Sequence, residues 1–209
     1  FVTVALVWVF LAVGLARDQA VGSRLKGAFR RPVENGWIFV HLQGKPSEIG
    51  FQHGYLLAPE IEEAQKVIAL VLTHDTSKDW GFFRAAAKSM LWPHIEQEYR
   101  DELKGIQEGL RARGVKLDLW DLVVTNAWLE FPYYVKWQAK QRPAPTSAPA
   151  GSRAEHCSAF VATGSYTKDG RVVIGHNAWT NYLEGSRWNI IFDLVPERGH
   201  RILMDGFPG

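Results

Sequence analysis

The spacing of apolar residues changes along the chain. From residue 59 to about residue 137 they recur at intervals of three and four, which is the spacing of one face of an α-helix. From residue 157 the period drops to two, which is typical of a β-strand. The pattern therefore predicts an α+β fold in which the N-terminal region, residues 17–137, is mostly helical.

Start and stop signals divide this helical region. A β-rich run at 37–42 predicts a strand. Helices are expected from Pro59 to residue 72, from Asp79 to Met90, at 95–110 and from 118 to about 137. Asp79 and one of Asp118 and Asp121 suit helix N-caps, whereas Gly114 suits a C-cap. Prolines 93 and 132 should kink or interrupt the helices. His53 with Gly54 is interpreted as a structural turn at the start of the helical region.

Two hairpins are predicted in the C-terminal region, residues 157–209. The first joins 157–163 to 171–177 through the Asp169-Gly170 turn, because Asp-Gly favours tight hairpin turns. The second joins 188–195 to 201–204.

The two ends of the helical region differ from it in composition. Residues 1–16 carry no charge, which favours a signal peptide or an N-terminal membrane anchor, with a buried first helix as the alternative. The polar stretch 17–31 is interpreted as a spacer or the start of the mature chain. Residues 138–156 are rich in proline and small residues, which predicts an exposed, cleavable linker. We therefore expect a secreted or periplasmic protein, or one anchored at its N-terminus.

Charge and motifs exclude several classes of function. The 24 basic and 22 acidic residues give a net charge of +2, which does not favour a nucleic-acid partner. The sequence shows no metal-ligand spacing, phosphate loop or dinucleotide fingerprint, so we expect neither metal nor cofactor. Nine Trp, six Tyr and eleven Phe indicate a well-packed core or an aromatic-lined pocket.

Cys157 is the single cysteine of the sequence and follows the linker directly. It is either a buried core thiol or a nucleophile. Cleavage between His156 and Cys157 would free an α-amine with a pKa of about 7.7–8.0, which could serve as the general base for the thiol on the same residue. The position of Cys157 therefore suggests an N-terminal nucleophile that is masked before cleavage.

The return strand of the first hairpin should bring further polar groups to Cys157. Counting back from the Asp169-Gly170 turn places His176 and Asn177 beside it. Asn177 could donate a hydrogen bond to an oxyanion, and His176 could position the thiol or the amine. Both residues could instead serve only to end the hairpin. Trp179 and Tyr182 follow and are expected to form a wall of the substrate pocket, with a core position as the alternative for Trp179.

The stretch from His156 to Tyr182 resembles the nucleophile hairpin of autoproteolytic cysteine N-terminal-nucleophile (Ntn) hydrolases. It is most similar to phospholipase B-like proteins and bacterial relatives grouped with the penicillin acyltransferase type. Residues 49–58 and 205–209 also resemble segments of that family. Trp179 stands where the more distant bile-salt and penicillin V hydrolases have Asp, which favours the phospholipase B-like branch.

The resemblance implies an αββα sandwich that is only partly present in this chain. It implies self-cleavage before Cys157, with non-covalent association of the two fragments. It also implies hydrolysis or transfer at a linear amide or ester bond of a small acyl or lipid substrate, with transient contact to a lipid surface. Two alternatives stay open: an exported non-catalytic binding domain, and a conventional Cys/His hydrolase that is not cleaved.

Overall fold

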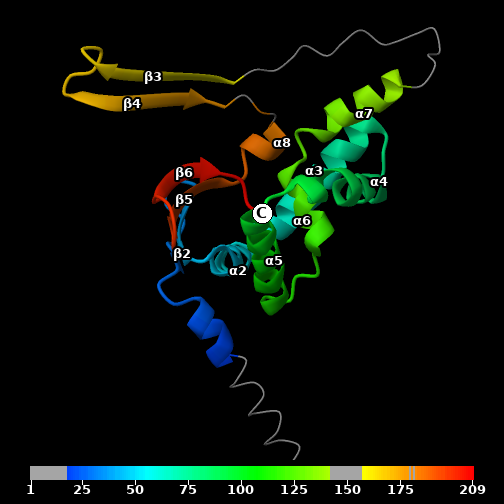
Figure 1. Cartoon of the computed structure of the whole chain (residues 1–209), viewed down its shortest axis with the longest axis horizontal. Helices are drawn as coiled ribbons and strands as arrows, with labels where there is room; N and C mark the ends of the chain where they lie inside the picture. Colours follow the sequence, from blue (N-terminus) through cyan, green and yellow to red (C-terminus); the bar gives the residue numbers. More distant parts are fainter. Residues whose placement is uncertain (1–17, 142–156, 179, 181) are drawn as a thin grey trace, which may run out of the picture.

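The computed structural model describes residues 18–141, 157–178, 180 and 182–209 (Figure 1). Helices dominate before residue 141 and strands dominate after residue 157, as the pattern predicted. The mixed α and β composition is therefore confirmed. Residues 1–16, for which a signal peptide or anchor was predicted, most of the predicted linker, His156 and Trp179 lie outside the described residues.

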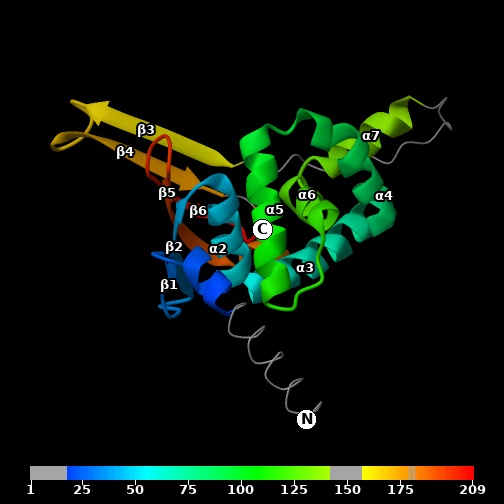
Figure 2. The ribbon, with the colours of Figure 1, turned by 60° about the horizontal axis from the view of Figure 1, so that its bottom comes forward.

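A mixed sheet lies on one side of the helices, with strand order β1-β2-β5-β6 in the described part of the chain (Figure 2). Its strands are β1 (Phe29–Arg30), β2 (Trp37–Gly44), β5 (Asn189–Pro196) and β6 (Ile202–Gly206). The predicted strand at 37–42 and the predicted hairpin at 188–204 are confirmed. The parallel pairing of β2 with β5 was not predicted, because it joins strands about 150 residues apart.

The helices follow the predicted periodicity closely. Their bounds are α2 (Pro46–Leu56), α3 (Ala58–Thr76), α4 (Trp80–Ala86), η1 (Ala87–Leu91, π-helical), η2 (Trp92–His94, 3₁₀), α5 (Gln97–Ala112), α6 (Leu119–Asn126), α7 (Phe131–Lys140) and α8 (Tyr182–Gly185). The Asp79 side chain caps α4 by accepting the Phe82 N–H at 2.8 Å. Asp118 and Asp121 form a reciprocal capping box on α6, so both predicted candidates contribute.

Helix α2 was not predicted, and its glycines explain why. Gly50 and Gly54 lower helix propensity, but they let the backbones of α2 and α5 touch. A Cβ atom at Gly50 would lie 2.0 Å from the Glu102 carbonyl oxygen, and one at Gly54 would lie 2.1 Å from that of Ile106. Packing against α5 therefore stabilises a helix that its sequence disfavours. The prediction of a turn at His53 is wrong, because His53 lies buried inside α2.

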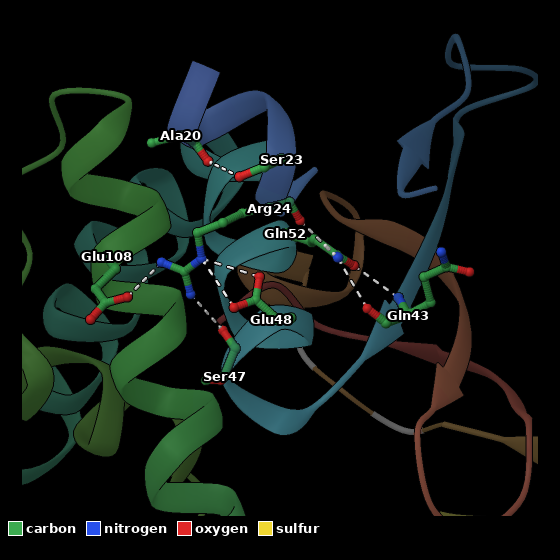
Figure 3. Close-up of polar contacts among 8 residues, drawn as sticks. All are labelled: Ala20, Ser23, Arg24, Gln43, Ser47, Glu48, Gln52 and Glu108. Atoms are coloured by element: carbon green, nitrogen blue, oxygen red, sulfur yellow. Dashed lines mark hydrogen bonds and ion pairs between the residues drawn. The ribbon is translucent and has the colours of Figure 1, made fainter. Parts of the chain in front are cut away.

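Part of the stretch 17–31, which was expected to be a spacer, instead packs against helices α2 and α5 through Arg24. Residues 18–24 are helical, and the Arg24 guanidinium binds two carboxylates and a carbonyl group (Figure 3). Its Nε lies 3.1 Å from Glu48, and its Nη1 lies 2.6 Å from Glu108. The guanidinium also lies 3.9 Å from the centre of the Phe51 ring. Arg24 thereby joins residues 18–24 to both α2 and α5.

The remaining boundaries refine the predictions. Pro93 lies in η2, between η1 and the start of α5, so the expected interruption is confirmed. Helix α7 continues to Lys140, which lies beyond residue 138, where the linker was expected to begin. Within the described residues, no helix combines the length and the apolar character needed to cross a membrane.

Candidate functional site

The first predicted hairpin is present as β3 (Ser158–Gly164) and β4 (Gly170–Asn177). Ser158 pairs with Asn177, and Ala159 pairs with His176. Cys157 directly precedes β3, so the prediction that residues 175–177 return beside it is confirmed. The turn is longer than the predicted Asp169-Gly170 turn: residues 165–169 join the strands, Gly170 already pairs with Gly164, and the register shifts between Ala162 and Gly164. Gly170 adopts a φ of 73°, and the Asp169 side chain accepts the Arg171 N–H.

The hairpin projects from the rest of the structure (Figures 1 and 2). Its turn lies at the far end, while the start of β3 and the end of β4 lie at the end nearer α8. Within the described residues, β3 and β4 pair with each other and with no further strand. Cys157, His176 and Asn177 are all exposed. In the part of the chain that the structure describes, Cys157 is therefore exposed and is not packed in the core.

The predicted pocket residues are only partly placed. Tyr182 begins α8 and is 91% exposed. Trp179 and the cleavage-site residue His156 lie outside the described residues. The roles of all three stay predictions.

Residues after the hairpin are held firmly against α3. Glu184 in α8 is buried, and its Oε2 accepts a hydrogen bond from the Thr180 hydroxyl at 3.3 Å. The buried Trp188 donates its indole N–H to Glu63 at 3.2 Å, and Arg187 forms an ion pair with the same carboxylate. The chain is thus anchored a few residues beyond Asn177.

A large cleft lies between the helices and the C-terminal strands, with a volume of about 1380 Å³. His53, Glu184, Trp188 and Phe192 contribute to its lining. His53 accepts the Gly209 N–H at Nε2 over 3.1 Å and makes an edge contact with the Phe192 ring. Burial lowers the pKa of His53 to about 4, so the imidazole is neutral at pH 7. Sequence reasoning missed this cleft because distant segments form it.

A cluster of three polar side chains, His41, Asp193 and Arg201, lies on the face of the sheet that points away from α2. The Asp193 carboxylate accepts hydrogen bonds from His41 Nδ1 at 2.7 Å and from Arg201 at 2.6 and 2.7 Å. These bonds, first those of Arg201 and then that of His41, lower the pKa of Asp193 to about 2. His41 and Asp193 face each other in the β2–β5 register, which the sequence did not reveal.

Metal-binding groups do not gather in the described part of the chain. No set of three or more His, Cys, Asp or Glu side chains lies close enough there to hold a metal ion.

Comparison with known proteins identifies one distant relative. The chain is 28% identical over 190 residues to an uncharacterized protein of Archaeoglobus fulgidus. The match covers 84% of this chain and 30% of the archaeal protein, so the chain spans less than a third of that relative's length. No family model matches the chain.

Proposed function

We propose that the chain carries the nucleophile of a self-cleaving cysteine hydrolase or acyltransferase that acts on linear amide or ester bonds. The observation that carries the proposal is the hairpin register, in which Asn177 and His176 face the first two residues after Cys157. An exposed thiol is accessible to a substrate, which a core thiol is not. Resemblance to Ntn hydrolases supplies the reaction class and the αββα sandwich, which both belong to the proposal.

The chemistry follows from a Cys157 that has become an N-terminus. Its α-amine takes the thiol proton, and Sγ attacks the substrate carbonyl carbon. The Asn177 amide group can donate a hydrogen bond to the oxygen as negative charge develops there. The amine or alcohol leaving group departs with the proton, which leaves a thioester on Cys157. Water or another acceptor then attacks the thioester, which releases the acyl group and restores the thiol.

Contacts across the proposed cleavage point favour fragments that stay together. β2 precedes the His156–Cys157 bond and β5 follows it, yet each of the eight residues of β2 has a partner in β5. The Arg187–Glu63 ion pair also crosses this point. We therefore expect two fragments that co-purify under native conditions and separate in denaturant. The proposal includes export directed by residues 1–16.

Mass spectrometry of the purified chain tests the proposal. We expect a fragment that begins at Cys157, and we expect Cys157→Ala to remain intact. Cys157→Ser is the matched control. Its hydroxyl can still attack the carbonyl carbon of the peptide bond after His156, so this variant should cleave itself slowly. A wild-type chain that stays as intact as Cys157→Ala, with no fragment beginning at Cys157, would refute self-cleavage.

The uncleaved Cys/His hydrolase makes a different prediction. It would hydrolyse a model ester while the linker stays intact, and it would lose this activity in His176→Ala. Activity that appears only after the fragment starting at Cys157 forms would exclude it. A thiol that resists alkylation, together with an intact linker, would instead favour a non-catalytic binding domain.

A further inference from the structure

A second hollow adjoins the large cleft at the helical end of the molecule. Its volume is about 380 Å³, and it lies between the α4–η1 segment and α7. Phe131, Tyr134 and Trp137 of α7 line one side. Met90 and Leu91 of η1 line both this hollow and the large cleft. The two hollows therefore meet at these two side chains, and we call them together the α7 groove.

The groove differs in polarity along its length. The smaller hollow is lined by aromatic and aliphatic side chains, with Glu130 as its charged member. The larger cleft adds His53, Glu102 and Glu184, together with Thr125. A narrow apolar end thus continues into a wider end that carries polar groups. This distribution matches an amphiphile, whose alkyl chain and polar head need different surroundings.

The lining of the smaller hollow favours an alkyl chain over a peptide. A peptide brings an N–H and a C=O at every residue, and these groups need partners when they leave water. An alkyl chain needs none and gains by burial against apolar side chains. Met90 lies in the π-helical turn and can adapt its flexible thioether to a chain of variable shape.

The position of the groove relative to the proposed nucleophile adds a second argument. Glu184 lies in α8, and Trp188 follows it shortly, so the wide end of the groove adjoins the segment after Asn177. Because Met90, Glu184 and Trp188 line the same cleft, an amphiphile with its chain at Met90 can extend toward α8. We propose that the α7 groove binds the alkyl chain of a fatty acyl substrate. This inference rests on the proposed acyl hydrolysis for its substrate class.

The test measures binding without turnover. The full chain carrying Cys157→Ala is titrated with cis-parinaric acid, a fluorescent fatty acid, which hexanoate, octanoate, decanoate and dodecanoate then displace. We expect saturable binding and an affinity that rises about fourfold with each added methylene while the groove has room. Met90→Asp should weaken binding at least about tenfold, because a carboxylate at the junction must be desolvated.

Two matched variants locate the probe. Leu70→Asp, like Met90→Asp, replaces an apolar side chain with a carboxylate. Leu70 is an exposed residue of α3 that lines neither hollow, so this variant should keep its affinity for cis-parinaric acid. Ile174→Asp introduces a carboxylate on the exposed hairpin, and this variant should also bind cis-parinaric acid with unchanged affinity. Circular dichroism checks that each variant folds.

Three results would overturn the inference: no saturable binding, equal binding by Met90→Asp, or binding lost only in Ile174→Asp. No binding with self-cleavage intact would remove the alkyl site and leave the proposed hydrolysis standing. Binding without self-cleavage would support the groove and remove the self-cleaving mechanism.

Discussion

The α2–α5 contact and the β3–β4 hairpin represent two extremes of packing in this molecule. In the first, glycines bring two helix backbones so close that a single Cβ atom would overlap a carbonyl oxygen. In the second, apolar side chains such as Phe160 and Ile174 are 61% and 69% exposed. The comparison teaches that apolar character alone does not show where the core lies. Helices α2 and α5 come into close contact at glycines, which have no side chain. Many apolar side chains of the hairpin, in contrast, are exposed to solvent.

The largest effect is expected where the backbones touch. Gly54→Val should destabilise the fold by about 3 kcal/mol or more, because the new side chain meets the Ile106 backbone, which cannot move aside without separating the helices. Urea denaturation followed by circular dichroism measures the loss.

Gly22→Ala is the matched control for this change. Gly22 lies in the helical residues 18–24, and no atom lies within 4 Å of a Cβ placed there. Helix propensity alone should make this variant up to about 1 kcal/mol more stable. Equal stability of Gly54→Val and the wild-type chain would show that α2 and α5 do not touch in this way.

The next effect, which develops fully only at acid pH, is expected from the buried imidazole beside this contact. The folded-state pKa of His53, about 4, lies below the ordinary value of 6.5. The unfolded chain therefore binds more protons between these pH values, and stability falls as the pH decreases from about 6.5 to 4. Full protonation of His53 should cost about 3 kcal/mol, since each pKa unit corresponds to about 1.4 kcal/mol.

Denaturation curves measured across this pH range test the role of His53. In His53→Gln the neutral amide can still accept the Gly209 N–H, so this share of the pH dependence should disappear. An unchanged slope in the variant would assign the acid sensitivity to other groups.

The smallest effect is expected on the hairpin. Ile174→Thr should change the free energy of unfolding by no more than about 0.5 kcal/mol, because the side chain is already largely in water and threonine keeps the β-branch. Ile190→Thr, at a fully buried position of β5, makes the same change and should cost several times more. Equal losses at the two positions would mean that the hairpin faces are covered in solution.

Much of the fold was predictable because its signals are local. Asp79 caps α4 and Asp118 with Asp121 caps α6, and both are visible as short polar residues before a helical run. The Asp169-Gly170 pair predicted a hairpin between 157–163 and 171–177, whereas its register also depends on the longer loop 165–169 and on a shift between Ala162 and Gly164. Helix α2 escaped prediction since glycine disfavours helices in isolation.

The sequence by itself determined the period of each half, the helix caps and the presence of the β3–β4 hairpin, because each depends on residues that are close together in the chain. The tertiary structure alone decided the parallel β2–β5 pairing, the His41–Asp193 bond and the α7 groove. Each of these joins segments that are far apart in the chain. Such contacts follow from the close fit of whole elements, which no short stretch of sequence encodes.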